Sequence, residues 1–93
     1  LGAAQALELG LVNRVAPATD VLAEALGIAA RLARGPRTAY RYMKQNIEAA
    51  AIETYQQLLD REAFSQCRTG GTADHREGVA AFVTKREPRF TGV

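Results

Sequence analysis

The sequence predicts an all-α fold of four to five helices, and three observations support this. Apolar residues recur at helical spacing over most of the 93 residues. Glycine or proline stands between most of these runs. Thr or Asp residues suited to helix N-caps precede several of them. The predicted helices span residues 3–9, 20–34, 36–51, 54–68 and 73–86.

The first two helices are predicted from helix-forming residues and from the residues at their ends. Residues 3–9 are rich in good helix formers and are followed by Gly10, which suits the C′ position. The LVNRVAP segment that follows is short, β-branched and closed by Pro17. This favours an extended connector, or one strand of a sheet that lies outside the chain. Thr19 or Asp20 is expected to cap the second helix.

No glycine or proline interrupts the sequence between the third and fourth helices, so the break between them is predicted from a capping signal instead. Gly35 ends the second helix, and Pro36 is expected in the first turn of the third. Thr54 and Gln57 have the spacing of a capping box, and a new apolar stripe opens after them. We therefore expect a break in the helix near residues 51–54.

The last helix is predicted to follow a flexible turn at Arg68–Gly71. Thr72 or Asp74 is expected to cap this helix, which runs to about Arg86 before Pro88 stops it.

The core of this chain is expected to be shallow. Alanine supplies much of the 47% hydrophobic fraction, so large apolar side chains are scarce. A domain of this size buries only about 60–65% of its unfolded surface. Self-association through the uncovered apolar stripes is therefore expected. Because Leu1 lies within a helical pattern, we also expect the sequence to be a segment of a longer polypeptide.

Charge, cysteine content and hydropathy narrow the class of protein. The net charge of +2 is too small to indicate nucleic-acid binding by itself. The single cysteine, Cys67, cannot form an internal disulfide, which suits a reducing, cytoplasmic location. No apolar run approaches the roughly 20 residues that a membrane span needs, and no signal peptide is evident.

No constellation of catalytic or metal-binding residues is recognisable. The only histidine, His75, lacks an orienting partner and a nucleophile at a suggestive spacing, so we interpret it as a surface residue. One His and one Cys do not make a zinc site, and Cys67 is interpreted as an inert thiol at a helix end. The glycine pair at residues 70–71 fits no phosphate-loop pattern. We expect no catalytic residue and no metal ligand in this chain.

A run of basic residues leaves two interpretations open. No acidic residue lies between Glu24 and Glu48, and Arg37, Arg41 and Lys44 share one side of a helix. A solvated helix face is the simpler interpretation; contact with phosphates of a nucleic acid or a nucleotide is the other. The basic residues of this run are Arg31, Arg34, Arg37, Arg41 and Lys44.

The final stretch, EGVAAFVTKREPRFTGV, combines aromatic and basic residues at the end of the last helix. On a helical wheel Val79 and Val83 point into the core, and Lys85 lies beside Phe82 toward the solvent edge. A half-buried aromatic ring beside a cation suits a ligand with a flat ring and a phosphate. The alternative is a core Phe82 with a snorkelling lysine.

The two ends of the chain resemble the C-terminal third of the crotonase superfamily, the enoyl-CoA hydratase/isomerase family. The AxxxxLGLVNRVAP pattern at the start and REGVAAFVTKREPRFTG at the end carry this resemblance, together with the Gly35–Pro36 pair and Lys44. The GGTADH turn followed by REGVAAF is also similar to isomerases of phenylacetate degradation. Isomerisation and hydration both remain open.

The resemblance implies a larger α/β fold of which this chain is one part. A full family member has an N-terminal core of ββα units with oxyanion-hole amides and acid/base carboxylates. A helical C-terminal region covers the active site and builds trimers, often dimers of trimers. Residues 1–93 would be this trimerisation and lid domain without the catalytic core, and we expect no activity from them alone.

The resemblance also implies a substrate and a site. Phe82 and Lys85 match family positions near the adenine and the 3′-phosphate of coenzyme A, while Arg89 and Phe90 match the tail pattern without an assigned role. The acyl-CoA thioester would be the substrate of the whole enzyme, and no covalent cofactor is expected. Two rival classes are a non-catalytic helical assembly module and a small basic nucleic-acid-binding domain.

Overall fold

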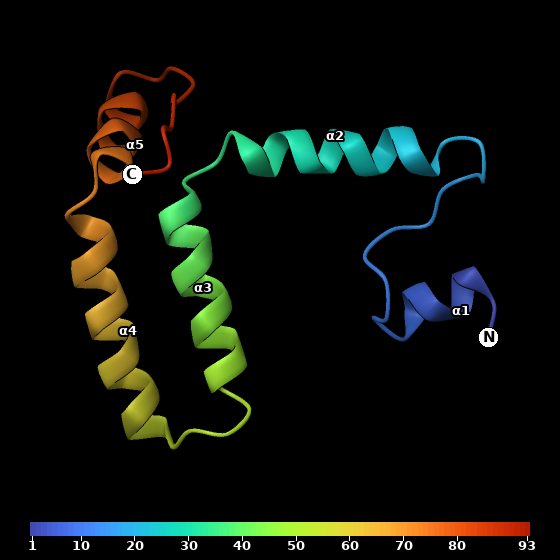
Figure 1. The fold of residues 1–93 in the computed structure, drawn as a ribbon, viewed down its shortest axis with the longest axis horizontal. Coiled ribbons are helices and arrows are strands. Elements are labelled where there is room, and N and C mark those ends of the chain that lie inside the picture. The colour runs from blue at the N-terminus through green and yellow to red at the C-terminus, as the bar shows by residue number, and fades with distance from the viewer. The chain divides into compact units, whose positions relative to one another are not determined.

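The computed structural model describes all residues from 1 to 93 and contains five α-helices and no strand (Figure 1). The predicted all-α class is confirmed, and each helix end lies within three residues of its predicted position. The chain divides into two compact units, residues 1–31 and residues 32–93. No helix is both long and apolar enough to cross a bilayer. The helices are α1 (Ala3–Glu8), α2 (Val21–Ala33), α3 (Arg37–Ala49), α4 (Tyr55–Gly70) and α5 (Ala73–Val83).

In the first unit, α1 ends in the way that Gly10 predicts. Gly10 has φ 71°, and its N–H donates to Leu7 O at 3.0 Å. The Leu11 N–H donates to Ala6 O at 2.9 Å, which completes a Schellman motif. The LVNRVAP segment forms no strand here. An ion pair between Arg14 and Glu24 joins this connector to α2.

In the second unit, a buried glycine precedes α3. A Cβ atom placed at Gly35 would lie 2.2 Å from the hydroxyl oxygen of Tyr40 and 2.5 Å from its ring, so any larger residue would displace the Tyr40 side chain. Pro36 is the N-cap residue of α3, one position before its predicted place in the first turn. The difference is small because a proline has no N–H to lose at either position.

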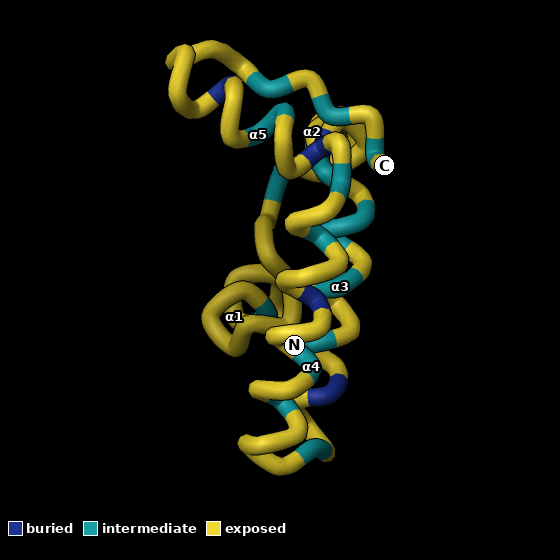
Figure 2. Tube along the Cα trace, turned by 90° about the vertical axis from the view of Figure 1, so that its left-hand side faces the viewer, coloured by how far each residue is buried: buried dark blue, intermediate teal, exposed yellow.

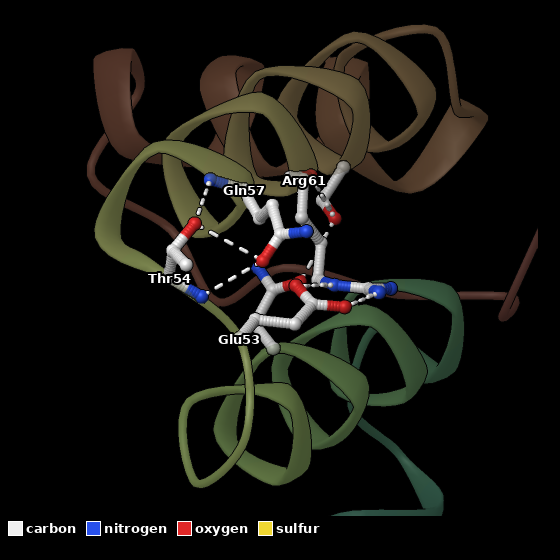
Figure 3. A network of polar contacts seen from close by, with 6 residues as sticks. Glu53, Thr54, Gln57 and Arg61 are labelled. Carbon is white, nitrogen blue, oxygen red and sulfur yellow. Dashed lines mark hydrogen bonds and ion pairs between the residues drawn. The ribbon is translucent and has the colours of Figure 1, made fainter.

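The predicted break between α3 and α4 is confirmed, and so is its capping box. The Gln57 N–H donates to Thr54 Oγ1 at 3.4 Å, and the Thr54 N–H donates to Gln57 Oε1 at 2.8 Å. Beside this box, Glu53 pairs with the guanidinium of Arg61, and Arg61 Nε lies 2.9 Å from Glu53 Oε2 (Figure 3). Because the guanidinium donates to it, the pKa of Glu53 is lowered.

The prediction of a flexible turn at Arg68–Gly71 is wrong. Residues 68–70 continue α4, and Gly71 follows as a C-cap residue with φ −80°. Threonine hydroxyls support this last turn: Thr69 Oγ1 donates to Ser65 O at 2.9 Å, and Thr72 Oγ1 donates to Thr69 O at 2.7 Å. Of the two predicted caps of α5, Thr72 has the role, since its hydroxyl accepts the His75 N–H at 3.0 Å.

Few side chains in the chain are buried, which agrees with the predicted shallow core (Figure 2). The buried apolar residues are Ala49 and Ala81, and the buried polar residues are Ser65 and Asp74. The prediction that Val79 and Val83 point into a core is wrong, because they are 51% and 73% exposed. The helical period correctly places these two valines on the same face of α5, but no element of this chain covers that face.

Candidate functional site

The last helix ends earlier than predicted, and Lys85 therefore lies outside it. Helix α5 ends at Val83, and Lys85 follows with φ 53°, in the left-handed region. The Lys85 N–H donates to Phe82 O at 3.3 Å, and the Arg86 N–H donates to Ala81 O at 3.0 Å. These two bonds form a second Schellman motif with lysine at C′, where α1 has glycine.

This ending changes the geometry that the helical wheel predicts for Lys85. A continuous helix places Lys85 beside Phe82 on one face, but a left-handed residue turns the chain away from the helix axis. Pro88 sets only the latest position at which the helix can end. Contacts of the residues after Lys85 determine where it does end.

Residues 86–93, here called the C-terminal hook, return along α5 and are held first by Glu77. Arg86 donates to the two carboxylate oxygens of Glu77 at 2.6 and 2.8 Å. The Arg89 N–H donates to Glu77 Oε1 at 2.7 Å. Because the Arg86 guanidinium and the Arg89 N–H donate to it, the pKa of Glu77 is lowered to about 2.

The end of the hook is held by Asp74, whose side chain is only 3% exposed. Its carboxylate accepts the Thr91 N–H at 2.7 Å and the Gly92 N–H at 2.8 Å, and the Asp74 N–H donates to Val93 O at 3.0 Å. Gly92 has φ 85°, a conformation that favours glycine.

The hook also contacts the start of α3 and the middle of α5. Arg37 Nη2 donates to the carbonyl of Thr91 at 2.9 Å, and Thr38 Oγ1 donates to that of Gly92 at 3.2 Å. The Phe90 ring packs against α5 at Gly78, where a Cβ atom would lie 3.6 Å from the ring. Acidic, basic and aromatic residues of EGVAAFVTKREPRFTG thus make contacts that build the hook.

The side chains of the two predicted site residues form no hydrogen bond with the hook. Phe82 is 86% exposed, and Lys85 is exposed without an ion pair or a side-chain hydrogen bond. The structure therefore brings the two predicted site residues to the same end of α5, although Phe82 is not half-buried as predicted. Phe82 also lines a recess of ≈ 400 Å³, together with Val79 and Phe90 and with residues of α3 and α4.

The predicted basic stripe is partly used inside the chain. Arg37 binds the hook, and the guanidinium of Arg41 lies 5.0 Å from the centre of the Tyr42 ring. The Tyr42 ring meets Phe64 edge-on at 6.2 Å, and the Arg68 guanidinium lowers the pKa of the Tyr42 hydroxyl. These contacts favour a structural role for part of the stripe and give no support to nucleic-acid binding.

The other candidate residues lie apart from one another. His75 is exposed and is joined to Thr72 only through its backbone N–H, and Cys67 is an exposed free thiol. No group of three or more His, Cys, Asp or Glu side chains is placed to hold a metal ion. The sequence interpretation did not identify Asp74 and Glu77 as anchors, although both are acidic residues in the first half of α5, three positions apart.

Comparison with known proteins identifies the family. The family model "Enoyl-CoA hydratase/isomerase" matches residues 1–93. The 1,2-epoxyphenylacetyl-CoA isomerase of Escherichia coli is 39% identical over 92 residues, which cover 99% of this chain and 35% of that protein. The crystal structure of an enoyl-CoA hydratase from Polaromonas sp. JS666 has a TM-score of 0.91 and 37% identity, covering 97% of this chain and 35% of that chain.

The helices and the C-terminal hook are thus those of the crotonase superfamily. The chain belongs to the enoyl-CoA hydratase/isomerase family. It spans about a third of the length of the relatives that it matches.

Proposed function

We propose that this chain is the C-terminal helical part of an enzyme that acts on acyl-CoA thioesters, and that Phe82 and Lys85 bind the adenosine 3′-phosphate end of coenzyme A. The E. coli relative is described as an isomerase of a CoA thioester, and the Polaromonas relative as a hydratase. The proposed substrate class is common to both descriptions, so hydration and isomerisation remain equal candidates.

One observation carries the proposal: an unpaired, exposed lysine occupies a left-handed position that favours glycine. A left-handed L-residue costs about 1–2 kcal/mol, and such backbone strain is concentrated at functional sites. The end of α1 has glycine at the same position of the same motif. A lysine at this position of α5 is therefore explained better by its ammonium group than by the turn.

The exposed side chain of Phe82 supplies the second half of the proposed site. An 86% exposed phenylalanine contributes little to folding but offers a flat apolar surface to an adenine ring. The Lys85 ammonium acts as a point charge toward a phosphate group. The two residues bind the part of the substrate that does not react, so they lower KM and leave the chemical step unchanged.

In this proposal the chemistry belongs to the rest of the enzyme. An oxyanion hole stabilises the enolate of the thioester, and carboxylates move the protons, as in the family that the chain belongs to. This chain contributes a lid, a binding surface and an assembly surface, and it has no activity alone. A reducing cytoplasm suits the exposed thiol of Cys67.

The assembly role is supported by the extent of uncovered apolar surface. Large apolar side chains are exposed on every helix, including Leu26 on α2 and Ile47 on α3. Patches of this kind usually bind a partner, and the proposed partners are the catalytic core and other copies of the enzyme. Light scattering of the whole enzyme should give a trimer or a dimer of trimers; a monomer mass would contradict this role.

The test compares two substrates in the whole enzyme that carries this segment. Lys85→Ala should raise KM for an acyl-CoA about two- to tenfold, as expected for the loss of a partly exposed charge contact, and leave kcat nearly unchanged. The same variant should not change KM for the matching acyl-pantetheine thioester, which lacks the adenosine 3′-phosphate.

The matched control is Lys44→Ala, which removes the only other lysine of the chain from the exposed side of α3. KM should stay at the wild-type value for both substrates in this variant. An unchanged KM for acyl-CoA in Lys85→Ala, or an equal rise for acyl-pantetheine, would exclude the proposed phosphate contact.

A further inference from the structure

The turn that carries Lys85 is attached to α5 through the next residue along the chain. Arg86 reaches back to Glu77 with bonds to both carboxylate oxygens, at 2.6 and 2.8 Å. The same carboxylate accepts the Arg89 N–H at 2.7 Å. One side chain of α5 therefore holds the hook on the C-terminal side of Lys85, through a guanidinium and through the backbone.

The backbone on the N-terminal side of Lys85 is held as well. The Lys85 N–H donates to Phe82 O at 3.3 Å, and the Arg86 N–H donates to Ala81 O at 3.0 Å. With φ 53°, Lys85 is in a region where L-residues are seldom stable without surrounding contacts. The contacts on both sides therefore determine the direction in which the lysine side chain leaves the backbone.

The ion pair between Glu77 and Arg86 does not lie in a buried core. The side chains of Glu77 and Arg86 are 24% and 45% exposed, and exposed ion pairs contribute little to folding stability. The two-point contact does, however, fix geometry, because a planar guanidinium and a carboxylate pair in one orientation. Precise direction matters more to Lys85, whose side chain has no hydrogen bond or ion pair, than to the hook, which Asp74 and Phe90 also hold.

We propose that Glu77 is a positioning residue for substrate binding, which acts through Arg86 to hold the turn that directs Lys85 toward the phosphate group of an acyl-CoA. This inference rests on the proposed function of Lys85. Glu77 itself does not touch the substrate. Its effect on binding should therefore disappear when the lysine ammonium is absent.

The experiment is a double-mutant cycle in the whole enzyme, with KM, kcat and Tm measured for each variant. Glu77→Gln keeps the shape of the side chain and removes the charge that orients Arg86. It should raise KM for acyl-CoA about two- to fivefold without changing kcat or KM for acyl-pantetheine. Arg86→Gln should give the same result.

The double variant Glu77→Gln with Lys85→Ala gives the decisive comparison. Its KM should equal that of Lys85→Ala alone, because a residue that acts through Lys85 has nothing left to position. If the fold-increase of KM in the double variant equals the product of the fold-increases in the two single variants, the proposed role of Glu77 is overturned.

The matched control is Glu53→Gln, which removes the other carboxylate–guanidinium pair of the same unit. The Glu53 side chain is 20% exposed, close to the 24% of Glu77, and its partner is also an arginine. This variant should leave KM unchanged. If Glu77→Gln also leaves KM unchanged while Lys85→Ala raises it, the positioning role is excluded and the proposed function stands. If Lys85→Ala itself leaves KM unchanged, both fail.

Discussion

Replacement of Lys85 by glycine should make the protein more stable and a weaker binder of its substrate. Lys85 has φ 53° at the C′ position of α5, a conformation that costs an L-residue about 1–2 kcal/mol. The greater freedom of glycine in the unfolded chain offsets about 0.4–1 kcal/mol of this gain. The net stabilisation expected for Lys85→Gly is on the order of 0.5–1 kcal/mol.

Thermal unfolding of the whole enzyme, followed by circular dichroism, measures the first half of this prediction. A stabilisation of about 1 kcal/mol raises Tm by about 2–4 °C for a chain of 150–250 residues, so an increase of about 1–4 °C is expected. Lys85→Ala keeps the Cβ atom and the strain, and its Tm should stay near that of the wild type. Both variants lose the ammonium group and should show the same two- to tenfold rise in KM for acyl-CoA, about the value expected of a partly exposed charge contact.

Gly10→Ala supplies the reverse control in the first unit. Gly10 has φ 71° in the Schellman motif of α1, and a Cβ atom there would meet nothing within 4 Å, so only backbone strain is introduced. This variant should lower Tm and leave KM unchanged.

Two results would refute the reasoning about Lys85. A lower Tm for Lys85→Gly would mean that the lysine side chain stabilises the fold by packing along α5, as a snorkelling residue does. A higher Tm with an unchanged KM would mean that the strained lysine has no role in binding acyl-CoA. Only a higher Tm together with a higher KM agrees with strain that is retained for binding.

Two further predictions concern contacts that hold the helices. The pKa of Glu77 is lowered from 4.5 to about 2, so its contribution to stability is complete above pH 4.5 and is lost as the pH falls toward 2. Urea unfolding should therefore show a smaller loss of stability between pH 5 and pH 3 in Glu77→Gln than in the wild type; an equal loss would contradict this. Thr54→Ala removes the capping box of α4 and should cost about 0.5–2 kcal/mol, seen as a lower Tm, whereas Thr54→Ser should keep most of the stability. Equal Tm values for Thr54→Ala and the wild type would contradict the capping role.

The existence and order of the five helices could be predicted because the signals are local. Gly10 ends α1 since few other residues adopt its left-handed conformation without cost, and the box formed by Thr54 and Gln57 divides α3 from α4 within four residues of sequence. Thr72 caps α5 for the same reason. The residues that form each of these helix ends lie within about one helical turn of one another in the sequence.

The candidate site was predictable only in part. Phe82 and Lys85 were identified through the resemblance of the last 17 residues to the enoyl-CoA hydratase/isomerase family, to which the chain does belong. Their exposure and their place at the end of α5 did not follow from the helical pattern. The pattern orients side chains around a helix, but it contains no information on which faces are covered.

The sequence by itself determined the helical class, the capping box of α4, the break before Thr54 and the family, because each depends on neighbouring residues or on a motif read as a whole. The tertiary structure decided where α5 ends, since Glu77 and Asp74 hold residues 86–93 through contacts that join positions 9 to 18 residues apart. It also decided that Val79 remains exposed, because no element of this chain covers it. The end of α5 depends on the free energy of contacts made by residues beyond its last turn. The helix propensities of the residues near that end do not include these contacts.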